Sequence, residues 1–376
     1  MPDFDSRVIR ILVIDDNTSL VLPLLRSFSG YKQIHLDVLL CAENSKNYFR
    51  YSRYLENLFI VSHLDATNLV DTIRSVVHKY KSELIIPTRE WISKLLFYQK
   101  SLLEEFITLH PMPDAATLAI TENKWNLNKW LGTHGFPDAA TADLLNGWHG
   151  DFPVLIKPVS GIGGEGIRVL KDALELEKIL KAYIGKQSGF FLQEFLEGYD
   201  IDFSFFAVDG QIQYYTIQRG LISAHMEYSK GIEFIRNQDF YNLASSMIST
   251  LRYTGIGHLD FRFNSKTNQY VLIDFNSRYW SSVQGSRAMG VNFPYLAVMY
   301  ALTGRIEKRE YRTGHYYFST TALKTKFKSL FGKTKYPVRL KDTQLYYLYN
   351  DPLPELMYMV GRLFKSIKRK QEGHEK

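Results

Sequence analysis

The residues of this chain that first suggest chemistry are acids placed inside apolar segments. Asp260 lies in the segment GIGHLDF, and Asp274 lies in YVLIDF, with Asn276 and Arg278 following at intervals of two. Side chains two apart on a strand share one face, and an antiparallel pairing of the two segments would place both carboxylates there. An acid in such a strand is costly unless it binds a metal or accepts hydrogen bonds.

Two carboxylates and an amide oxygen predict a magnesium site that phosphate oxygens complete. Arg278 is positioned to contact a phosphoryl oxygen. His258, two residues before Asp260, shares its strand face and is either catalytic or a hydrogen-bonded structural histidine. The alternative for the whole group is an exposed hairpin with solvated charges.

A glycine-rich segment, GIGGEG at residues 161–166, matches the pattern G-x-G-x-x-G. Strand-like residues 154–158 and 167–170 flank it, so it predicts a hairpin tip and not the strand-to-helix loop of a dinucleotide site. Glycine backbones can approach a polyphosphate closely, and Lys157 just before the tip could add a positive charge. An ordinary flexible hairpin is the alternative. The glycines concerned are Gly161, Gly163, Gly164 and Gly166.

The elements that would position these residues fall into two parts. Residues 1–113 alternate apolar strands with helices, which predicts a parallel sheet covered by helices. The strands are expected at residues 8–14, 36–41, 58–62 and 84–87, and helices at 18–27, 66–81 and from about 90. After the boundary signal HPMP, helices are expected from residues 114 and 121 and at 237–251. The later strands are expected at residues 154–158, 167–170, 190–195, 201–208, 211–218, 258–263 and 270–275.

Length and composition limit the class of protein. The chain has 376 residues, of which 45% are hydrophobic, enough for two or three packed units. The one cysteine, Cys41, excludes a disulfide framework and a zinc site built from several thiolates. Neither a secretory signal nor an apolar run long enough to span a bilayer is visible, so a cytoplasmic protein is expected.

The order of these motifs, over roughly residues 8–302, resembles the ATP-grasp superfamily. Within it the chain looks most similar to carboxylate–amine ligases related to carbamoyl-phosphate synthetase and D-alanine–D-alanine ligase. The resemblance implies an α/β and α+β fold: a parallel pre-ATP-grasp domain at 1–113, then an ATP-grasp fold of two α+β subdomains clasping the nucleotide at 114–304. The lid subdomain is expected at about 140–195, and a basic extension at 305–376.

The resemblance also implies roles for single residues. Lys124 and Lys157 correspond to the two nucleotide-binding lysines, and the glycines of 161–166 to the lid over the phosphates. The segment FLQEFLEG resembles the hinge that holds adenine, mainly through its backbone. Its implied contacts are Gln193, Glu194 and Leu196, with Asp200 at the ribose.

Asp260, Asp274 and Asn276 fall on the metal ligands of the family, and Arg278 on its phosphate-contacting arginine. His258 and Arg219 are further catalytic candidates, although Arg219 has the alternative of an exposed turn residue. The chain departs from the family in having Asp at the second metal acid and at the ribose acid, where Glu is usual.

The resemblance implies an ATP-dependent ligase that uses Mg²⁺, with Mn²⁺ as a second candidate ion. A small-molecule carboxylate would become an acyl phosphate, which an amine then attacks. The hairpin lid would close to exclude water, because an acyl phosphate hydrolyses readily. No recognised nucleic-acid-binding module is present, and a homo-oligomer is compatible with the sequence.

The basic charge of the chain is concentrated at its C-terminal end. The net charge is +7, and residues 305–376 carry 17 Lys or Arg against 7 Asp or Glu. Residues 354–370 have an apolar stripe beside basic residues, which indicates a helix packed on its own domain or, alternatively, a weak peripheral contact with an anionic membrane. Two alternatives to a ligase follow: a non-catalytic nucleotide-binding protein, and a membrane-associated scaffold for surface-polymer synthesis.

Overall fold

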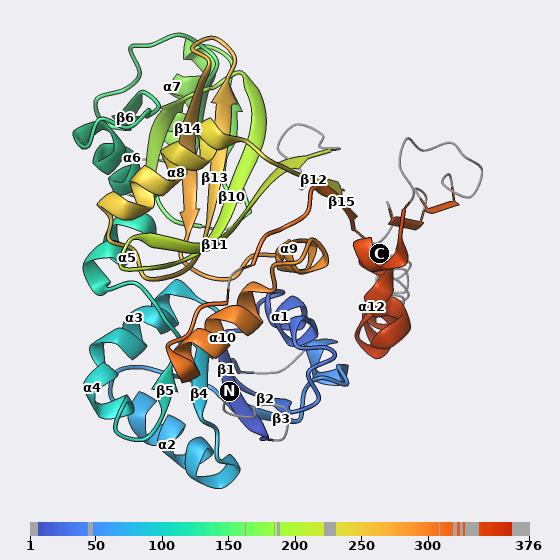
Figure 1. The fold of residues 1–376 in the computed structure, drawn as a ribbon. Coiled ribbons are helices and arrows are strands. Elements are labelled where there is room, and N and C mark those ends of the chain that lie inside the picture. Colours follow the sequence, from blue (N-terminus) through green and yellow to red (C-terminus); the bar gives the residue numbers. More distant parts are fainter. Residues whose placement is uncertain are drawn as a thin grey trace, which may run out of the picture. The chain divides into compact units, whose positions relative to one another are not determined.

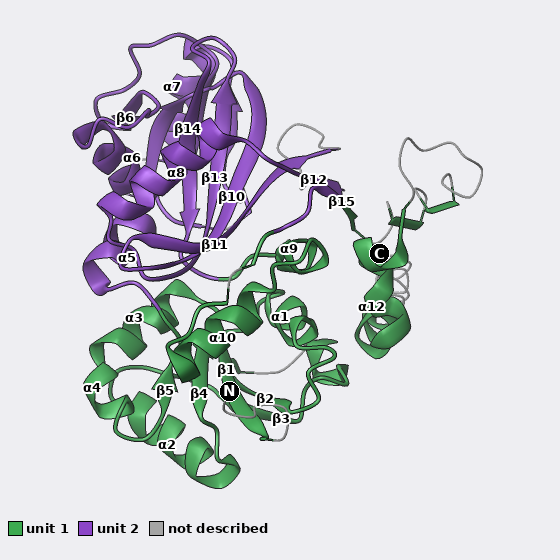
Figure 2. Cartoon of the chain, viewed as in Figure 1, with its two compact units in different colours: residues 1–111, 279–310, 315–376 green, residues 112–278, 311–314 purple. Residues whose placement is uncertain are grey.

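The chain forms two compact units in a computed structural model (Figure 2). The structure describes residues 7–43, 48–161, 163–183, 185, 189–221, 231–307, 309–318, 322–323, 326–327 and 338–362. Unit 1 comprises residues 1–111, 279–310 and 315–376, and unit 2 comprises residues 112–278 and 311–314.

Unit 1 is built on a five-stranded sheet of order β3-β2-β1-β4-β5, in which every pair is parallel. Its strands are β1 (Ile9–Asp15), β2 (Ile34–Cys41), β3 (Asn57–Val61), β4 (Leu84–Pro87) and β5 (Thr108–Leu109). Its helices are α1 (Val21–Ser27), α2 (Leu69–Tyr80), α3 (Glu90–Tyr98), α4 (Lys100–Leu103), α9 (Val283–Ala288), α10 (Phe293–Thr303) and α12 (Leu345–Asn350), with 3-10 turns η1 (Tyr48–Tyr51) and η3 (Leu340–Asp342) (Figure 1). The predicted parallel α/β unit is confirmed.

Two helices of unit 1 begin later than predicted, and acidic side chains explain both starts. Asp15 accepts hydrogen bonds from the backbone N–H and the hydroxyl of Thr18, so a turn precedes α1. Asp65 likewise accepts from the backbone of Thr67 and Asn68 before α2. Such local bonds to an aspartate offer the backbone an alternative to the helix.

The C-terminal residues of unit 1 pack against its N-terminal residues. The buried guanidinium of Arg26 donates from Nε to Asp351 at 2.9 Å and from two nitrogens to Glu355 at 2.5 and 2.6 Å. Asp351 also accepts from the hydroxyl of Ser52 at 2.8 Å. These bonds favour the packed interpretation of the tail over the described part of it. Much of the predicted basic stripe, including Lys324, Lys328, Lys333, Lys335 and residues 363–370, lies outside the described residues.

Unit 2 contains two sheets. The strands β6 (Thr141–Asp143), β9 (Phe190–Glu194), β7 (Val154–Pro158) and β8 (Arg168–Leu170) form one sheet in that order. The other has the order β14 (Gln269–Asn276), β13 (Gly255–Asn264), β10 (Gly198–Val208), β11 (Gln211–Gly220) and β12 (Gly231–Ile235). The strand that follows β12 in this order, β15 (Gly314–Tyr317), has only its first residue in unit 2. The helices are α5 (Ala115–Thr121), α6 (Lys124–Thr133), α7 (Ala173–Ala182) and α8 (Gln238–Thr250).

The larger sheet has one apolar and one polar face. The apolar face carries Phe203 and Phe205 of β10 and Phe261 of β13, which pack with residues of α8, including Phe240, in one buried core. Figure 1 shows α8 lying across this sheet. Because strand side chains alternate, the residues between them point to the other face. That face carries the acids and the histidine of the predicted site.

The smaller sheet packs with α7 around a core that includes Val154, Ile156, Leu176 and Leu192. Its strands β7 and β8 pair antiparallel, so the described residues between them, 159–161 and 163–167, are the tip of a hairpin, as the glycine-rich segment predicted. Antiparallel sheets with helices over a hydrophobic face are an α+β arrangement, and this part of the predicted fold class is also confirmed.

The two units divide the chain differently from the three predicted domains. Residues 279–310 and 315–376 belong to the same unit as the N-terminal strands. Packing units need not coincide with sequence domains, so the boundaries 1–113, 114–304 and 305–376 stay predictions. Among the described residues, no helix is long and apolar enough to cross a membrane.

Candidate functional site

The two acids predicted to share a face lie directly opposite each other. β13 and β14 pair antiparallel with Asp260 opposite Asp274 and His258 opposite Asn276. The amide nitrogen of Asn276 donates to Asp260 at 3.2 Å, and its amide oxygen accepts from Arg278 at 2.6 Å. The sheet therefore brings together the three predicted metal ligands and the predicted phosphate-contacting arginine.

A β-bulge adjoins this group. The register shifts after Asp260, so that Phe261 pairs with Leu272 and Ile273 is the extra residue of β14. A bulge turns the local backbone out of the regular ladder. The carbonyl of Ile273 accordingly accepts a long hydrogen bond, 3.4 Å, from the ammonium of Lys157.

Lys124 stands at the first residue of α6, where Asn123 caps the helix by accepting from the backbone N–H groups of residues 125 and 126. The Lys124 ammonium lies 2.7 Å from the Asp274 carboxylate and 3.1 Å from the carbonyl oxygen of Gly161. One lysine thus links the helix, the hairpin tip and an acid of the predicted metal site.

Lys157 is the second buried ammonium of the group. It lies in β7 and donates to the side-chain oxygen of Gln193 at 2.9 Å. Burial, partly offset by the charge of Asp274, lowers the pKa of Lys157 to about 8. An ammonium held in this way gains most from a ligand that brings negative charge.

The hairpin tip needs its glycines. Gly161, Gly163, Gly164 and Gly166 have φ angles of 143°, 68°, 75° and 80°, in the region where L side chains are strained. An ideal Cβ on Gly164 would meet no atom within 4 Å, so this part of the tip is open. Ile162 lies outside the described residues.

The segment predicted to hold adenine continues from the end of β9. Leu196 packs with Ala139, Val271 and Ile273 in a small apolar cluster, a surface on which a flat aromatic base can lie. Its carbonyl accepts from Arg262 at 3.0 Å. Glu194, the last residue of β9, donates its backbone N–H to the carbonyl of residue 140.

Arg262 also ties Asp200 to this segment. The guanidinium donates to the Asp200 carboxylate at 2.8 Å, and that carboxylate is about half exposed. Arg262 therefore joins Asp200, the predicted ribose residue, to Leu196 of the predicted adenine segment.

His258 is buried between Ser204 and Asp260. A nearby acid, Asp202, was not among the residues predicted from the sequence. The His258 ring lies 2.8 Å from the Ser204 hydroxyl through Nδ1 and 3.1 Å from Asp260 through Nε2. Burial opposes the charge of His258, but the charge and hydrogen bond of Asp260, together with the charge of Asp202, raise the His258 pKa. Burial raises the pKa of Asp202 to about 7, and the charge of Asp260 adds to the effect. The alternation of Asp200 and Asp202 along one strand was the signal for the missed acid.

Arg219 lies apart from this group. It pairs with Ile201, an apolar-face residue of β10, whereas Gln218 pairs with Asp202 on the polar face. The Arg219 guanidinium donates to Glu233 at 2.7 Å. The structure thus places Arg219 on the opposite side of the sheet from the metal-ligand candidates.

The residues present fit a divalent cation and a phosphate chain. Oxygen donors of Asp260, Asp274 and Asn276 share one face, which is the ligand chemistry that Mg²⁺ prefers. The ammonium of Lys124 already pairs one positive charge with the Asp274 carboxylate. Two lysines and an open glycine tip within the same unit offer charges and backbone groups to an anion.

Comparisons with known proteins gave a family match and similar folds. A family model described as an ATP-grasp domain matches residues 121–282. A comparison with curated protein sequences gave no match.

Similar solved structures cover most of the chain. N5-carboxyaminoimidazole synthetase from Staphylococcus aureus, complexed with ADP, is 12% identical, covers 87% of each chain and has a TM-score of 0.65. The biotin carboxylase domain of Hydrogenobacter thermophilus 2-oxoglutarate carboxylase is 13% identical, with 82% and 74% coverage and a TM-score of 0.64. L-amino acid ligase from Bacillus licheniformis is 14% identical, with 83% and 80% coverage and a TM-score of 0.63. At these identities the likeness is one of fold. Together with the matched family model, it identifies residues 121–282 as an ATP-grasp domain.

Proposed function

We propose that the protein is an ATP-dependent ligase that joins a carboxylate to an amine through an acyl phosphate, with Mg²⁺ as its metal. The observation that carries the proposal is the convergence of Lys124, Lys157 and the glycine tip with the pair Asp260 and Asp274. The same convergence gives each group a role in binding or positioning the nucleotide.

The lysines would bind the phosphates. A phosphate oxygen beside Lys124 competes with Asp274 for its ammonium and so frees that carboxylate for the metal. Lys157 would regain full charge beside the same phosphates. The glycine tip, residues 161–166, would cover them with backbone N–H groups and exclude water.

Asp260, Asp274 and Asn276 would hold the metal, which would offset the negative charge of the phosphates. A carboxylate oxygen of the substrate attacks the γ-phosphorus, and the bond to the departing ADP breaks. The amine nitrogen then attacks the acyl carbon, the bond to the phosphate oxygen breaks, and the nitrogen loses a proton. Arg278 would stabilise negative charge on the phosphoryl oxygens in both steps.

The similar structures support this reaction class, although they do not identify the substrates of this protein. One is described as an L-amino acid ligase, and another as a biotin carboxylase domain in complex with MgADP, ADP and bicarbonate. Amino acids and bicarbonate are therefore the first carboxylate substrates to test. A homo-oligomer and a peripheral membrane contact stay predictions.

The test is substrate-dependent release of phosphate from Mg·ATP, measured with pools of amino acids, other small carboxylates and bicarbonate. We expect a stimulated rate that falls about 100-fold or more in Asp274→Asn, since that change removes a charged metal ligand. Asp209→Asn is the matched control, because Asp209 is an exposed acid paired with Arg252 at the turn after β10. Its rate should equal that of the unaltered protein.

An ¹⁸O-labelled carboxylate then tests the intermediate. One ¹⁸O atom should appear in the released phosphate, because the attacking oxygen leaves with the phosphoryl group. Phosphate without the label would contradict the acyl phosphate. ATP binding with no stimulated release from any pool would favour the non-catalytic nucleotide-binding protein.

A further inference from the structure

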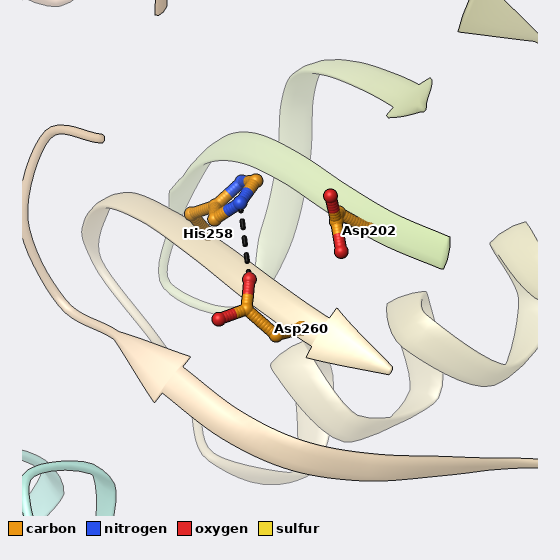
Figure 3. A group of neighbouring side chains, drawn as sticks. All are labelled: Asp202, His258 and Asp260. Atoms are coloured by element: carbon orange, nitrogen blue, oxygen red, sulfur yellow. Dashed lines mark ion pairs between the residues drawn. The ribbon is translucent and has the colours of Figure 1, made fainter. Parts of the chain in front are cut away.

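Three side chains of types that commonly bind metals, Asp202, His258 and Asp260, lie close together on the polar face of the larger sheet. Asp202 comes from β10, and His258 and Asp260 come from β13, with Asp202 directly opposite Asp260 in the sheet. Each residue offers one ligand atom, and these atoms lie within 4.8 Å of one another. Figure 3 shows the imidazole and the two carboxylates directed toward a common region.

The spacing of the donor atoms suits a small cation. The Nε2 atom of His258 and the Oδ1 atom of Asp260 are 3.1 Å apart. Two ligands at right angles around an ion, with bonds of about 2.0–2.2 Å, are separated by about 3 Å. The pair can therefore bind one ion with little change in its own geometry.

In His258 and Asp202, the polar atom that would not bind the ion makes a hydrogen bond to another side chain. The Nδ1 atom of His258 is 2.8 Å from the hydroxyl of Ser204, a fully buried residue. A metal bound at Nε2 would replace the contact of that atom with Asp260, while Nδ1 donates to Ser204, which is the usual arrangement of a metal-binding histidine. The Oδ2 atom of Asp202 accepts from Gln218 at 3.1 Å, which leaves Oδ1 for the ion.

One carboxylate oxygen of Asp260 faces this cluster, and the other contacts a proposed magnesium ligand on β14. Its Oδ2 atom accepts from Asn276, and its Oδ1 atom faces His258. A carboxylate used in this way can bridge two cations, one on each side. The cluster is therefore separate from the proposed magnesium ligands Asp274 and Asn276, although it shares Asp260 with them.

We propose that Asp202, His258 and Asp260 form a second divalent-metal site, selective for an ion such as Zn²⁺ or Co²⁺. An imidazole nitrogen favours these ions, whereas Mg²⁺ and Ca²⁺ prefer an all-oxygen set. All three ligands belong to the protein, so the ion binds without nucleotide. The site therefore does not depend on the proposed ligase reaction, and a failure of that reaction would leave it testable.

The experiment titrates the nucleotide-free, full-length protein with Co²⁺ and records visible absorption and binding heat. One ion per chain is expected. Affinity should fall at least about tenfold in His258→Gln and in Asp202→Asn, because each change removes one of three ligands. Asp274→Asn is the discriminating control: it alters the proposed magnesium ligands alone, so Co²⁺ affinity should remain within about twofold of the original.

Three results would overturn the site. These are no Co²⁺ binding, equal binding by the His258→Gln protein, or loss of binding in Asp274→Asn with retention in Asp202→Asn. Metal-free thermal unfolding checks that each variant is folded. For a variant that does not fold, Cu²⁺, a paramagnetic ion that imidazole binds well, gives a second measurement on the unaltered protein labelled with ¹⁵N-histidine. Spin-echo coupling to ¹⁵N is expected, and its absence would rule out imidazole coordination.

Discussion

At the scale of single residues, the polar face combines two kinds of buried charge. Lys124 has a carboxylate partner at 2.7 Å, whereas Lys157 donates to neutral oxygens of Gln193 and Ile273. Hydrogen bonds to neutral groups do not offset the cost of burying an ammonium as fully as an ion pair does. This difference makes Lys157 the residue whose protonation should respond most to a nucleotide.

Nucleotide affinity should therefore depend on pH through Lys157. Its pKa of about 8 in the free protein rises when phosphates bind, so binding takes up a proton. Affinity is highest below pH 8 and should fall up to about tenfold per pH unit above it, until the pKa of the bound state is reached. Isothermal titration of ATP from pH 7 to 9.5 measures this slope.

The Lys157→Met protein should bind ATP more weakly, and its ATP affinity should no longer fall with pH. Lys181→Met is the control: it changes an exposed lysine paired with Glu177 and should keep the pH dependence. The same slope in the Lys157 variant would assign the titration to another group.

At the scale of elements, the two faces of β13 have different requirements. The polar face places His258 and Asp260, and the apolar face must pack against aromatic rings. Gly257 lies at such a packing position: an ideal Cβ there would be 2.6 Å from two ring atoms of Phe205. Phe205 is fully buried and edge-on to Tyr253 and Phe275, so its ring has little room to move.

Gly257→Ala should therefore destabilise unit 2 by about 1–3 kcal/mol, the usual cost of overpacking a filled core. Gly189→Ala is the matched control, because a Cβ at Gly189 would meet nothing within 4 Å. Urea unfolding of the two variants measures the difference. Equal midpoints would mean that Phe205 can give way.

The elements also show what the sequence could and could not predict. Apolar periodicity predicted β7 and β4 to the residue, and alternation predicted that Asp274 and Asn276 share a face. The register between β10 and β13 could not be predicted, because periodicity says which face a residue takes but not which strand lies beside it. The alternation of Asp200 and Asp202 could have placed both acids on one face, but nothing in the sequence placed Asp202 beside Asp260, about 60 residues later.

At the scale of the whole molecule, unit 1 is assembled from the two ends of the chain. Arg26 is 1% exposed and makes its ion pairs with Asp351 and Glu355. Arg287 joins the same region through the carbonyl of Arg26 and the hydroxyl of Tyr347. The sequence could not predict this, because the paired residues are separated by 325 positions and neither belongs to a motif.

Asp351→Ala should lower the stability of unit 1 by about 3 kcal/mol, because it leaves a buried guanidinium with one carboxylate partner. Hydrogen exchange should become faster in β1 and β2 and stay unchanged in β13. Glu177→Ala, which removes an exposed ion pair, should leave stability nearly unchanged. Unchanged exchange in β1 after Asp351→Ala would show that Glu355 alone is sufficient for Arg26.

The distant pairing of Arg26 with Asp351 has a consequence for the order of folding during synthesis. The ribosome releases Arg26 early, but its carboxylate partners emerge only after nearly all of unit 2 has left the exit tunnel. The unit that starts first is therefore completed last. The strands of the ATP-grasp domain can pair before the segment with Asp351 and Glu355 has been synthesised. Until that segment packs on the N-terminal sheet, the guanidinium of Arg26 stays exposed to water.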